Sequence, residues 1–331
     1  MHEKIDMRAS LDRVARGGIP LRAEQRLAEE AGENRRLFTS DLSVSEFLLA
    51  RDAGCEPIAQ LMGSSIYHIG QIPDYKGKTA ELMVISDGHR ESRRLALNRL
   101  WQEATLVGAD AVVGARLRER LITMGARGKG GDDGGNILEF TVVGTAVKAP
   151  WLTHAPGQPV VTDLSGQDLW ALAQDGWEPC GFLFEFCRFH VWHVTKNQRG
   201  MGTFELDEAS LAVEQARTIA ANKLLQQAAA CGAEFVIGSD IDVNVREVPC
   251  GYGGCPLDDL DVDVSWFGTG VRLIPHAAHK RHEVPPLLLS MMPVGRRHDD
   301  LIEAEDDADD VEVAAEEAEE MALEADEAAS E

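Results

Sequence analysis

The sequence predicts an α+β protein in which two similar units of about 110 residues follow one another, each with a small, mainly antiparallel sheet and one long helix. Three observations carry this prediction. A segment of 24 residues recurs 124 positions later, and each copy has the apolar spacing of a helix followed by a strand. The negative charge is concentrated in the last part of the chain, which indicates an acidic tail outside the two units.

The repeat is clearest at the predicted helices. Residues 91–114 read ESRRLALNRLWQEATLVGADAVVG, residues 215–238 read QARTIAANKLLQQAAACGAEFVIG, and ten of the 24 positions are identical. Average amino-acid usage gives roughly one or two identities by chance. The same offset pairs FTVVGTAVK at 140–148 with VSWFGTGVR at 264–272, whereas the tripeptide DLS recurs at an offset of 122. We interpret this as a tandem duplication with a two-residue insertion before the second helix.

Each unit is expected to run from strands through a helix to a closing strand pair. The opening stretches, 56–71 and 178–194, are rich in apolar and aromatic residues, as paired strands are. The long helices are expected at about 91–107 and 214–231, where apolar residues recur every three or four positions. In the first helix the charged residues fall largely off this apolar stripe: Arg93, Arg94, Arg99 and Glu103. Glycines then end both helices, at Gly108 and Gly232.

Four further segments accompany the two units. The expected order is an N-terminal extension with a short helix at about Leu21–Ala31 (1–39), the first unit (40–150), a proline-bearing linker (151–162), the second unit (163–275), a His/Pro segment (276–297) and a disordered acidic tail (298–331). Disorder is expected of the tail because 17 carboxylates between Asp299 and Glu331, with no basic residue, repel one another. The tail is expected to tether a basic protein partner or to act as a solubilising brush.

Charge and composition exclude several classes of protein. The chain has 32 Lys+Arg against 56 Asp+Glu, a net charge of −24, which argues against nucleic-acid binding. No run of 18 apolar residues suggests a membrane span, and the N-terminus has no apolar stretch typical of a secretory signal. Six cysteines at irregular spacings do not form a secreted disulfide pattern, so we expect a cytoplasmic protein.

The pairing of GADAVVG at 108–114 with VVGTAVK at 142–148 resembles the YbjQ-like family of small bacterial proteins, described as heavy-metal-binding domains. The resemblance covers about residues 40–150 and, more weakly, 163–275. It implies a compact unit similar to a dodecin subunit, assembled as a pentameric ring, and no settled biochemical activity. Glu234-Phe235 and Trp266-Phe267 depart from the pattern, so equivalent functions are not expected of both copies.

Six residues are candidate ligands of a divalent metal ion: His68, His190, Cys187, His193, Cys250 and Cys255. His68 and His190 align between the repeats at an offset of 122. Along a strand, Cys187 and His193 share one face while His190 points to the other, so the three cannot all bind one ion. Cys250 and Cys255 supply only two of the four ligands that zinc requires. Structural histidines and free thiols are the alternatives to a metal site.

Three classes of function remain open from sequence. The first is a non-enzymatic, cytoplasmic, ring-forming homo-oligomer that acts as a scaffold or binding platform of uncharacterised role. The second is a metal- or small-ligand-binding protein, and the third is an enzyme with a site between subunits, although no catalytic constellation is evident. Six aromatic residues favour packing, either of the two units on each other or between chains: Trp170, Trp177, Phe182, Phe184, Phe186 and Phe189.

Overall fold

The computed structural model describes residues 7–31, 39–40, 42–69, 77–123, 136–153, 157–192, 205–249 and 258–274. They fall within one compact unit, Met1–Arg281. The predicted His/Pro segment and acidic tail lie outside the described residues.

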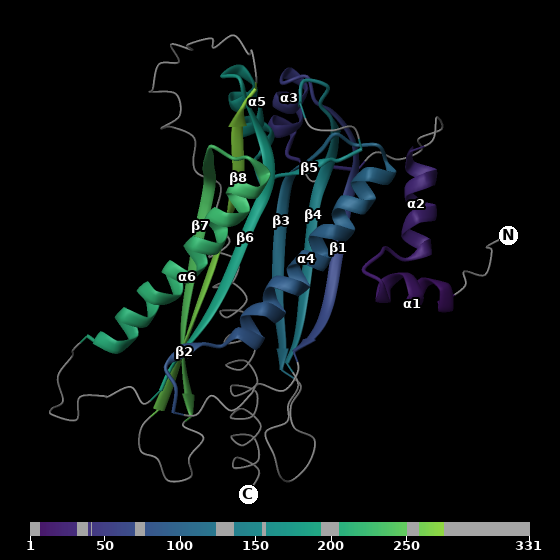
Figure 1. Ribbon diagram of the computed structural model, residues 1–331. Coiled ribbons are helices and arrows are strands. Elements are labelled where there is room, and N and C mark those ends of the chain that lie inside the picture. The colour runs from purple at the N-terminus through teal and green to yellow at the C-terminus, as the bar shows by residue number, and fades with distance from the viewer. Residues whose placement is uncertain are drawn as a thin grey trace, which may run out of the picture. The chain divides into compact units, whose positions relative to one another are not determined.

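Figure 1 shows a mixed α+β fold with two four-stranded sheets. The helices are α1 (Met7–Ala15), α2 (Leu21–Ala31), α3 (Val44–Asp52), α4 (Met83–Leu106), α5 (Gly166–Gln174) and α6 (Asp207–Cys231). The strands are β1 (Glu56–Ile69), β2 (Ala80–Glu81), β3 (Ala111–Thr123), β4 (Asn136–Lys148), β5 (Val160–Val161), β6 (Trp177–Val191), β7 (Phe235–Pro249) and β8 (Asp258–Leu273). Across the described ranges, none of the helices is long and apolar enough to pass through a membrane.

The first sheet has the strand order β1-β4-β3-β5 and the second sheet the order β2-β6-β8-β7. The three long strands of each sheet are antiparallel. The prediction of paired strands within 56–71 and 178–194 is wrong, because each stretch forms one long strand whose partner is the closing strand, β4 or β8. The long helices begin at Met83 and Asp207, earlier than their apolar spacing indicated.

The first half (α3 to β4) and the second half (α5 to β8) match in their irregularities. We call two residues of the two halves equivalent when their numbers differ by 122 before the long helix and by 124 from the long helix onward. The strand register agrees with these offsets: Met62 pairs with Val143 in the first sheet, and their equivalents Phe184 and Phe267 pair in the second. Register shifts occur at equivalent places in both sheets: Pro57/Ala59 and Pro179/Gly181, and Val113/Arg116 and Ile237/Asp240. Bulges of this kind are features of a fold rather than defects.

The repeated DLS tripeptide begins a helix in both halves. Ser43 and Ser165 are the N-caps of α3 and α5, and each forms a capping box with the acidic residue three positions later. Such a cap stabilises a helix by about 1 kcal/mol. The two short helices pack against each other at one end of the sheets.

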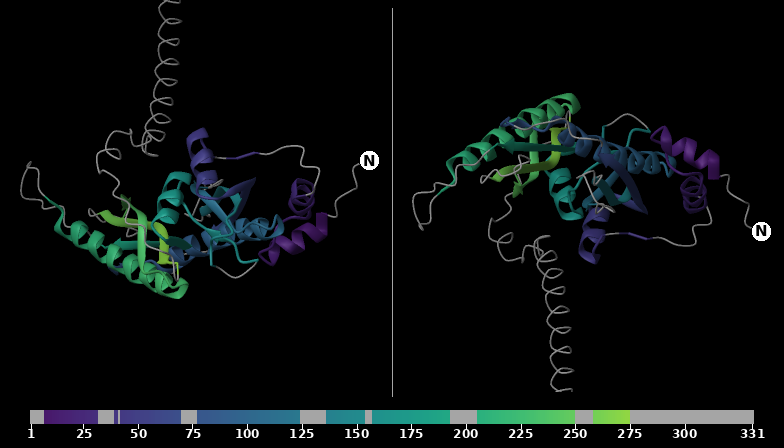
Figure 2. Two further views of the ribbon diagram at one scale, coloured as in Figure 1. Left: turned by 90° about the horizontal axis from the view of Figure 1, so that it is seen from above. Right: turned by 90° about the horizontal axis from the view of Figure 1, so that it is seen from below.

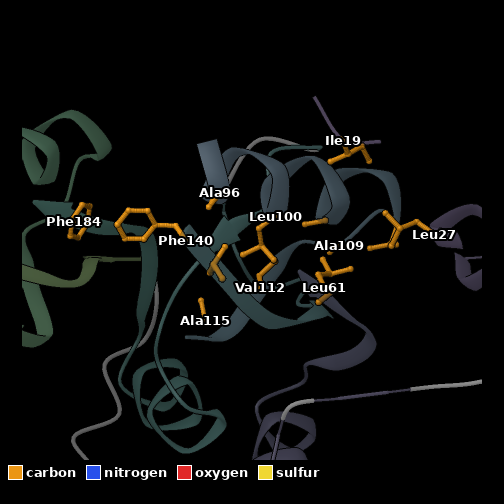
Figure 3. Packing of buried hydrophobic residues seen from close by; sticks show 14 of the residues in the cluster. Ile19, Leu27, Leu61, Ala96, Leu100, Ala109, Val112, Ala115, Phe140 and Phe184 are labelled. Atoms are coloured by element: carbon orange, nitrogen blue, oxygen red, sulfur yellow. The ribbon is translucent and has the colours of Figure 1, made fainter. Parts of the chain in front are cut away.

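Helix α4 lies across β1 and β4, and α6 lies across β6 and β8, as the views in Figure 2 also show. Ala96 and Leu100 of α4 are fully buried against the first sheet, next to Leu61 and Val112 (Figure 3). The closest approach is at Gly63 on β1, where an added Cβ would lie 2.0 Å from the carbonyl oxygen of Ala96. Helix α4 contacts β3 less than β1 and β4, and α6 contacts β7 less than β6 and β8.

Candidate functional site: the contact between the two sheets

The six predicted metal ligands do not come together in the part of the chain that the structure describes. His68 is exposed on β1 of the first sheet, whereas His190 on β6 of the second sheet is fully buried. Cys187 packs against the alanines of α6, on the opposite face of β6 from His190, as strand alternation predicts. His193, Cys250 and Cys255 lie outside the described residues.

Carboxylates surround His190. Its Nδ1 lies 2.8 Å from Oδ1 of Asp261, and its Nε2 lies 3.6 Å from Oδ2 of Asp259. Beside it, Arg188 forms two hydrogen bonds of 2.5 Å to the carboxylate of Asp263. Over the described ranges, no group of three or more His, Cys, Asp or Glu side chains is arranged to hold a metal ion. The geometry favours a buried, paired histidine over a metal ligand.

The two sheets meet beside α4. Phe184 and Phe186 of β6 belong to the hydrophobic core of the first sheet, where Phe140 of β4 points toward Phe184 (Figure 3). The guanidinium of Arg93 on α4 lies 3.4 Å from the ring centroid of Phe184 and 4.7 Å from that of Phe140. The imidazole of His89 stacks on Phe186 with ring centroids 3.7 Å apart. Two of the six aromatic residues predicted to favour packing, Phe184 and Phe186, therefore join the two halves of one chain.

Glu119 on β3 compensates the charge at this contact. It accepts a hydrogen bond from Arg93, and its other oxygen lies 2.8 Å from Nδ1 of His89. Burial lowers the pKa of Arg93 to about 10 and also lowers the pKa of His89, although Glu119 acts in the opposite direction on both. Burial by itself raises the pKa of Glu119, but hydrogen bonding to His89 and the charge of Arg93 bring it to about 2.

The expectation that Arg93 and Glu103 lie off the buried face of α4 is wrong. Each is only 3% exposed. Arg93 is covered by β6, a strand about 90 residues away in sequence, so the helix period could not show its burial. Glu103 accepts a hydrogen bond of 3.1 Å from the backbone N–H of Met62 at the outer edge of β1, and its carboxylate also pairs with Arg26.

Strand β2 and the first turns of α4 form hydrogen bonds along the edge of β6. Strand β2, directly before α4, pairs with β6 at His190 and Phe189. The backbone N–H of Arg188 donates to Oγ of Ser86 at 3.0 Å, and Arg90 donates to the carbonyl of Phe186 and to the carboxylate of Glu185. The outer edge of β6 is thus hydrogen-bonded by the first half of the chain.

The outer strands of the two sheets keep apolar side chains exposed. On β7 these are Ile241, Val243 and Val245, which are 37%, 42% and 47% exposed. They face the α6 side of the second sheet, because their partners across β8 lie in the core beneath α6. On β1, Met62 and Ile66 are 52% and 74% exposed on the side away from α4. Apolar side chains gathered on edge strands are typical of protein contacts.

Two thiols that the sequence analysis did not single out lie close together. Sγ of Cys180 on β6 is 3.4 Å from Sγ of Cys231 at the end of α6, and both line an open cavity of about 680 Å³. Burial and the neighbouring thiol raise the pKa of Cys180 to about 12. Their equivalents, Ile58 and Val107, are both buried in the core of the first half. No spacing motif in the sequence indicates this pair, because the packing of α6 on β6 brings the two cysteines together.

We expect diamide to oxidise Cys180 and Cys231 to a disulfide, because little movement separates the two sulfur atoms from bonding distance. The reaction should be slow at pH 7 and faster at pH 9, since only the thiolate attacks. Peptide mass spectrometry should show a linked pair lacking two hydrogens, and Cys231→Ser should prevent it. Persistence of both free thiols in excess diamide at pH 9 would contradict the geometry.

Two comparisons with known proteins gave matches. Residues 77–150, which comprise α4, β3 and β4, match the YbjQ family model described as "Putative heavy-metal-binding", in agreement with the predicted resemblance. The chain is also 35% identical over 219 residues to the "Encapsulin nanocompartment protein Rv1762c" of Mycobacterium tuberculosis (strain ATCC 25618 / H37Rv), covering 64% of this chain and 80% of that relative. No solved structure matches the chain significantly.

The second match corrects the predicted function. A cytoplasmic ring-forming scaffold of uncharacterised role was expected, but a relative that aligns over most of both chains is named as a protein of a nanocompartment. The physical reason for the error is that repeat patterns indicate which faces of a subunit are apolar. The angle between neighbouring subunits, which decides what kind of assembly forms, does not follow from those patterns.

Proposed function

Because the chain belongs to the family of the encapsulin nanocompartment protein Rv1762c, we propose that it is a self-assembling structural component of a protein nanocompartment. The identity of 35% over 80% of that relative is the observation that carries the proposal. A structural role needs surfaces that bind other subunits rather than a reactive centre. A cytoplasmic location and a homo-oligomeric state, both expected from the sequence, are part of the same proposal.

The exposed edges of the two sheets support self-assembly. Strand β7 is the last strand of its sheet, and its side chains Ile241, Val243 and Val245 are partly exposed. At the start of the first sheet, β1 pairs with β4 alone among the described strands, and it exposes Met62 and Ile66. Edge strands with exposed apolar residues are templates for association unless they are covered. Two such edges on one chain give it two places at which to bind further copies.

We also propose that the two halves arose by tandem duplication. The support is the identical order of their long strands, β1-β4-β3 and β6-β8-β7, together with their equivalent bulges and capping boxes. Equivalent glycines also have the same left-handed backbone, with φ of 69° at Gly108 and 74° at Gly232. Duplication would give each half both a long helix and an opening strand, the two kinds of element that meet where β6 packs on α4.

The metal site at His68, His190, Cys187, His193, Cys250 and Cys255 stays a prediction. The described members of this set lie on different sheets or different faces, so a shared ion would require the residues outside the described part. Elemental analysis of the untagged protein tests it directly: one bound metal ion per chain supports the site, and none argues against it. The basic protein partner predicted for the acidic tail likewise stays a prediction.

The assembly proposal predicts that the untagged chain, expressed without any partner, forms particles much larger than one chain of 36.1 kDa. Light scattering coupled to size exclusion at micromolar concentration measures the mass, and negative-stain electron microscopy shows whether the particles enclose a volume. Hollow particles of uniform size are the expected result. A monomer at all concentrations tested would contradict the proposed function.

A further inference from the structure

Building on the proposed self-assembly, we infer that the contact between the two halves of one chain is repeated between chains. In this contact the outer edge of β1 of one copy packs on the exposed face of β7, beside α6, of the next copy. Two surfaces define it. The receiving surface consists of Ser210, Val213 and Arg217 of α6 and of Ile241, Val243 and Val245 of β7. The inserting edge consists of Met62, Ser64 and Ile66 of β1 together with Ser40 and Leu42, which precede α3.

The receiving surface is the equivalent of one that is already occupied within the chain. On α4, the contact with β6 buries Ser86, His89 and Arg93, which are 0%, 3% and 3% exposed. Their equivalents on α6 are Ser210, Val213 and Arg217. Ser210 is exposed, Val213 is half-buried, and the side chain of Arg217 is 53% exposed. The same helix surface is therefore covered in the first half and uncovered in the second.

The chemistry of the receiving surface suits an apolar occupant. Glu119, which compensates Arg93 and His89 at the internal contact, is replaced by its equivalent Val243, and His89 by Val213. Two ionisable positions have become valines. An uncovered valine patch next to a helix gains free energy when apolar side chains remove it from water.

The inserting edge is the equivalent of the strand that fills the internal site. Phe184, Phe186 and Arg188 of β6 correspond to Met62, Ser64 and Ile66 of β1. By this equivalence Met62 corresponds to the ring over Arg93, the equivalent of Arg217, and Ser64 to the ring stacked on His89, the equivalent of Val213. Ile66 corresponds to Arg188, whose charge interacts with Glu119, the equivalent of Val243. Met62 and Ile66 are apolar, and both are exposed within one chain. The outer edges of β1 and β6 also form equivalent backbone hydrogen bonds. The N–H of Met62 donates to the side chain of Glu103. The N–H of Phe184 donates to the side chain of Gln227, the equivalent of Glu103.

Backbone hydrogen bonds provide a second part of the contact. Within the chain, the segment that leads into α5 pairs with the outer edge of β3, since Ala115 donates to the carbonyl of Thr162 and Gly114 to that of Leu164, both at 2.9 Å. The equivalent edge of β7 pairs with no strand among the described residues. The equivalents of Thr162 and Leu164 are Ser40 and Leu42, which precede α3. The inserting edge of the next copy thus supplies both the apolar side chains and this strand-like pairing.

The two surfaces differ from each other, so the contact is heterologous: each copy inserts on one neighbour and receives another. Within the part of the chain that the structure describes, the edge that would fill the receiving surface lies on the first half of the same chain, on the opposite side of the internal contact. The occupant is therefore another copy of this protein.

Two variants test the inference, each breaking one surface. Val243→Asp places a charge in the receiving surface, and Ile66→Asp places one on the inserting edge. We expect each to raise the apparent dissociation constant of assembly by roughly 30-fold or more, the effect of a central interface residue. Leu211→Asp is the matched control: Leu211 is an exposed apolar residue of α6, and its equivalent Asp87 has a side chain 63% exposed beside the internal contact. It should assemble like the wild type.

Mixing the two variants gives the sharpest result. Each retains one intact surface, so an equimolar mixture should form a heterodimer of two 36.1 kDa chains and nothing larger, whereas each alone stays monomeric. Native mass spectrometry measures this, with circular dichroism to establish that each variant is folded. If Val243→Asp does not fold, Val245→Asp takes its place.

The outcomes separate this inference from the proposed function. Wild-type particles that survive both variants would overturn the inferred contact and leave the nanocompartment role standing. A wild-type chain that is monomeric throughout would overturn the proposed function itself. Monomeric variants whose mixture yields no heterodimer would show that the two surfaces do not bind each other, and would also overturn the inference.

Discussion

Replacing Gly63 with alanine is expected to cost at least about 3 kcal/mol of unfolding free energy, the upper range for overpacking a core. The added Cβ would lie 2.0 Å from the carbonyl oxygen of Ala96 and 2.6 Å from the backbone nitrogen of Leu100. Both are backbone atoms of α4, so the whole helix would have to move away from β1. Guanidinium unfolding followed by far-ultraviolet circular dichroism measures the change.

Gly181→Ala is the matched control for this prediction. Gly181 also lies on the opening strand of its sheet, but its added Cβ would meet only the side chain of Cys231, at 3.8 Å, an ordinary contact distance. We expect a change of less than about 0.5 kcal/mol there. Both variants must be compared at one protein concentration, because assembly makes apparent stability depend on concentration. Equal effects of the two substitutions would contradict the close packing of α4 on Gly63.

Glu119→Gln is expected to cost about 3 kcal/mol at pH 7, because it leaves the buried guanidinium of Arg93 without its compensating carboxylate. Arg93 is 3% exposed and lies between aromatic rings, so its guanidinium has little access to water, whereas the side chain of Glu119 is 30% exposed. The double variant Arg93→Met, Glu119→Gln should recover part of the loss, since it removes the stranded charge. A double-mutant cycle by chemical denaturation measures the coupling.

Glu91→Gln serves as the control on the same helix. Glu91 pairs with Arg94 at 2.7 Å, but both side chains are largely exposed, so its loss should change stability by less than about 0.5 kcal/mol. If Glu119→Gln were as mild as this control, the contact between the sheets would not depend on the ion pair of Arg93 with Glu119.

The same carboxylate gives the fold an acid dependence. The pKa of Glu119 is lowered from 4.5 to about 2, so its contribution to stability is complete above pH 4.5 and is lost as the pH falls toward 2. The lowered pKa of His89 acts in the same direction, because the unfolded chain takes up that proton more readily. Glu119→Gln should therefore remove part of the loss of stability between pH 4.5 and 2. An unchanged pH profile would show that other carboxylates dominate acid unfolding.

The spacing of apolar residues and the positions of glycines were sufficient to predict much of the secondary structure. Helix α2 covers Leu21–Ala31, the range expected from its sequence, and both long helices include the ranges that apolar spacing indicated, although they begin earlier, at Met83 and Asp207. Gly108 and Gly232 follow the long helices with a left-handed backbone, the conformation that glycine adopts without a steric cost. These features depend on residues within a few positions of each other, which is why a single sequence shows them.

Prediction was poorer where residues distant in the sequence decide the environment. Arg93 and Glu103 were expected to be off the buried face, yet β6 covers one and the edge of β1 with Arg26 covers the other. Cys180 and Cys231 lie 51 positions apart with no spacing motif, and only the packing of α6 on β6 brings them together. The six predicted metal ligands had suggestive spacings, but the strand faces separate the described ones.

Three features follow from the amino-acid sequence alone: the internal identity of residues 91–114 and 215–238, the order of long helix and closing strands in each half, and the concentration of acidic charge at the C-terminus. They do so because periodicity, composition and internal identity are properties of the chain alone. The three-dimensional fold was needed to show that β6 of the second half covers α4 of the first, and that no described residue covers α6 and β7 on the equivalent side in the same way. Burial depends on which distant surfaces meet in space, and two copies of nearly the same pattern can therefore have one face covered and the other free.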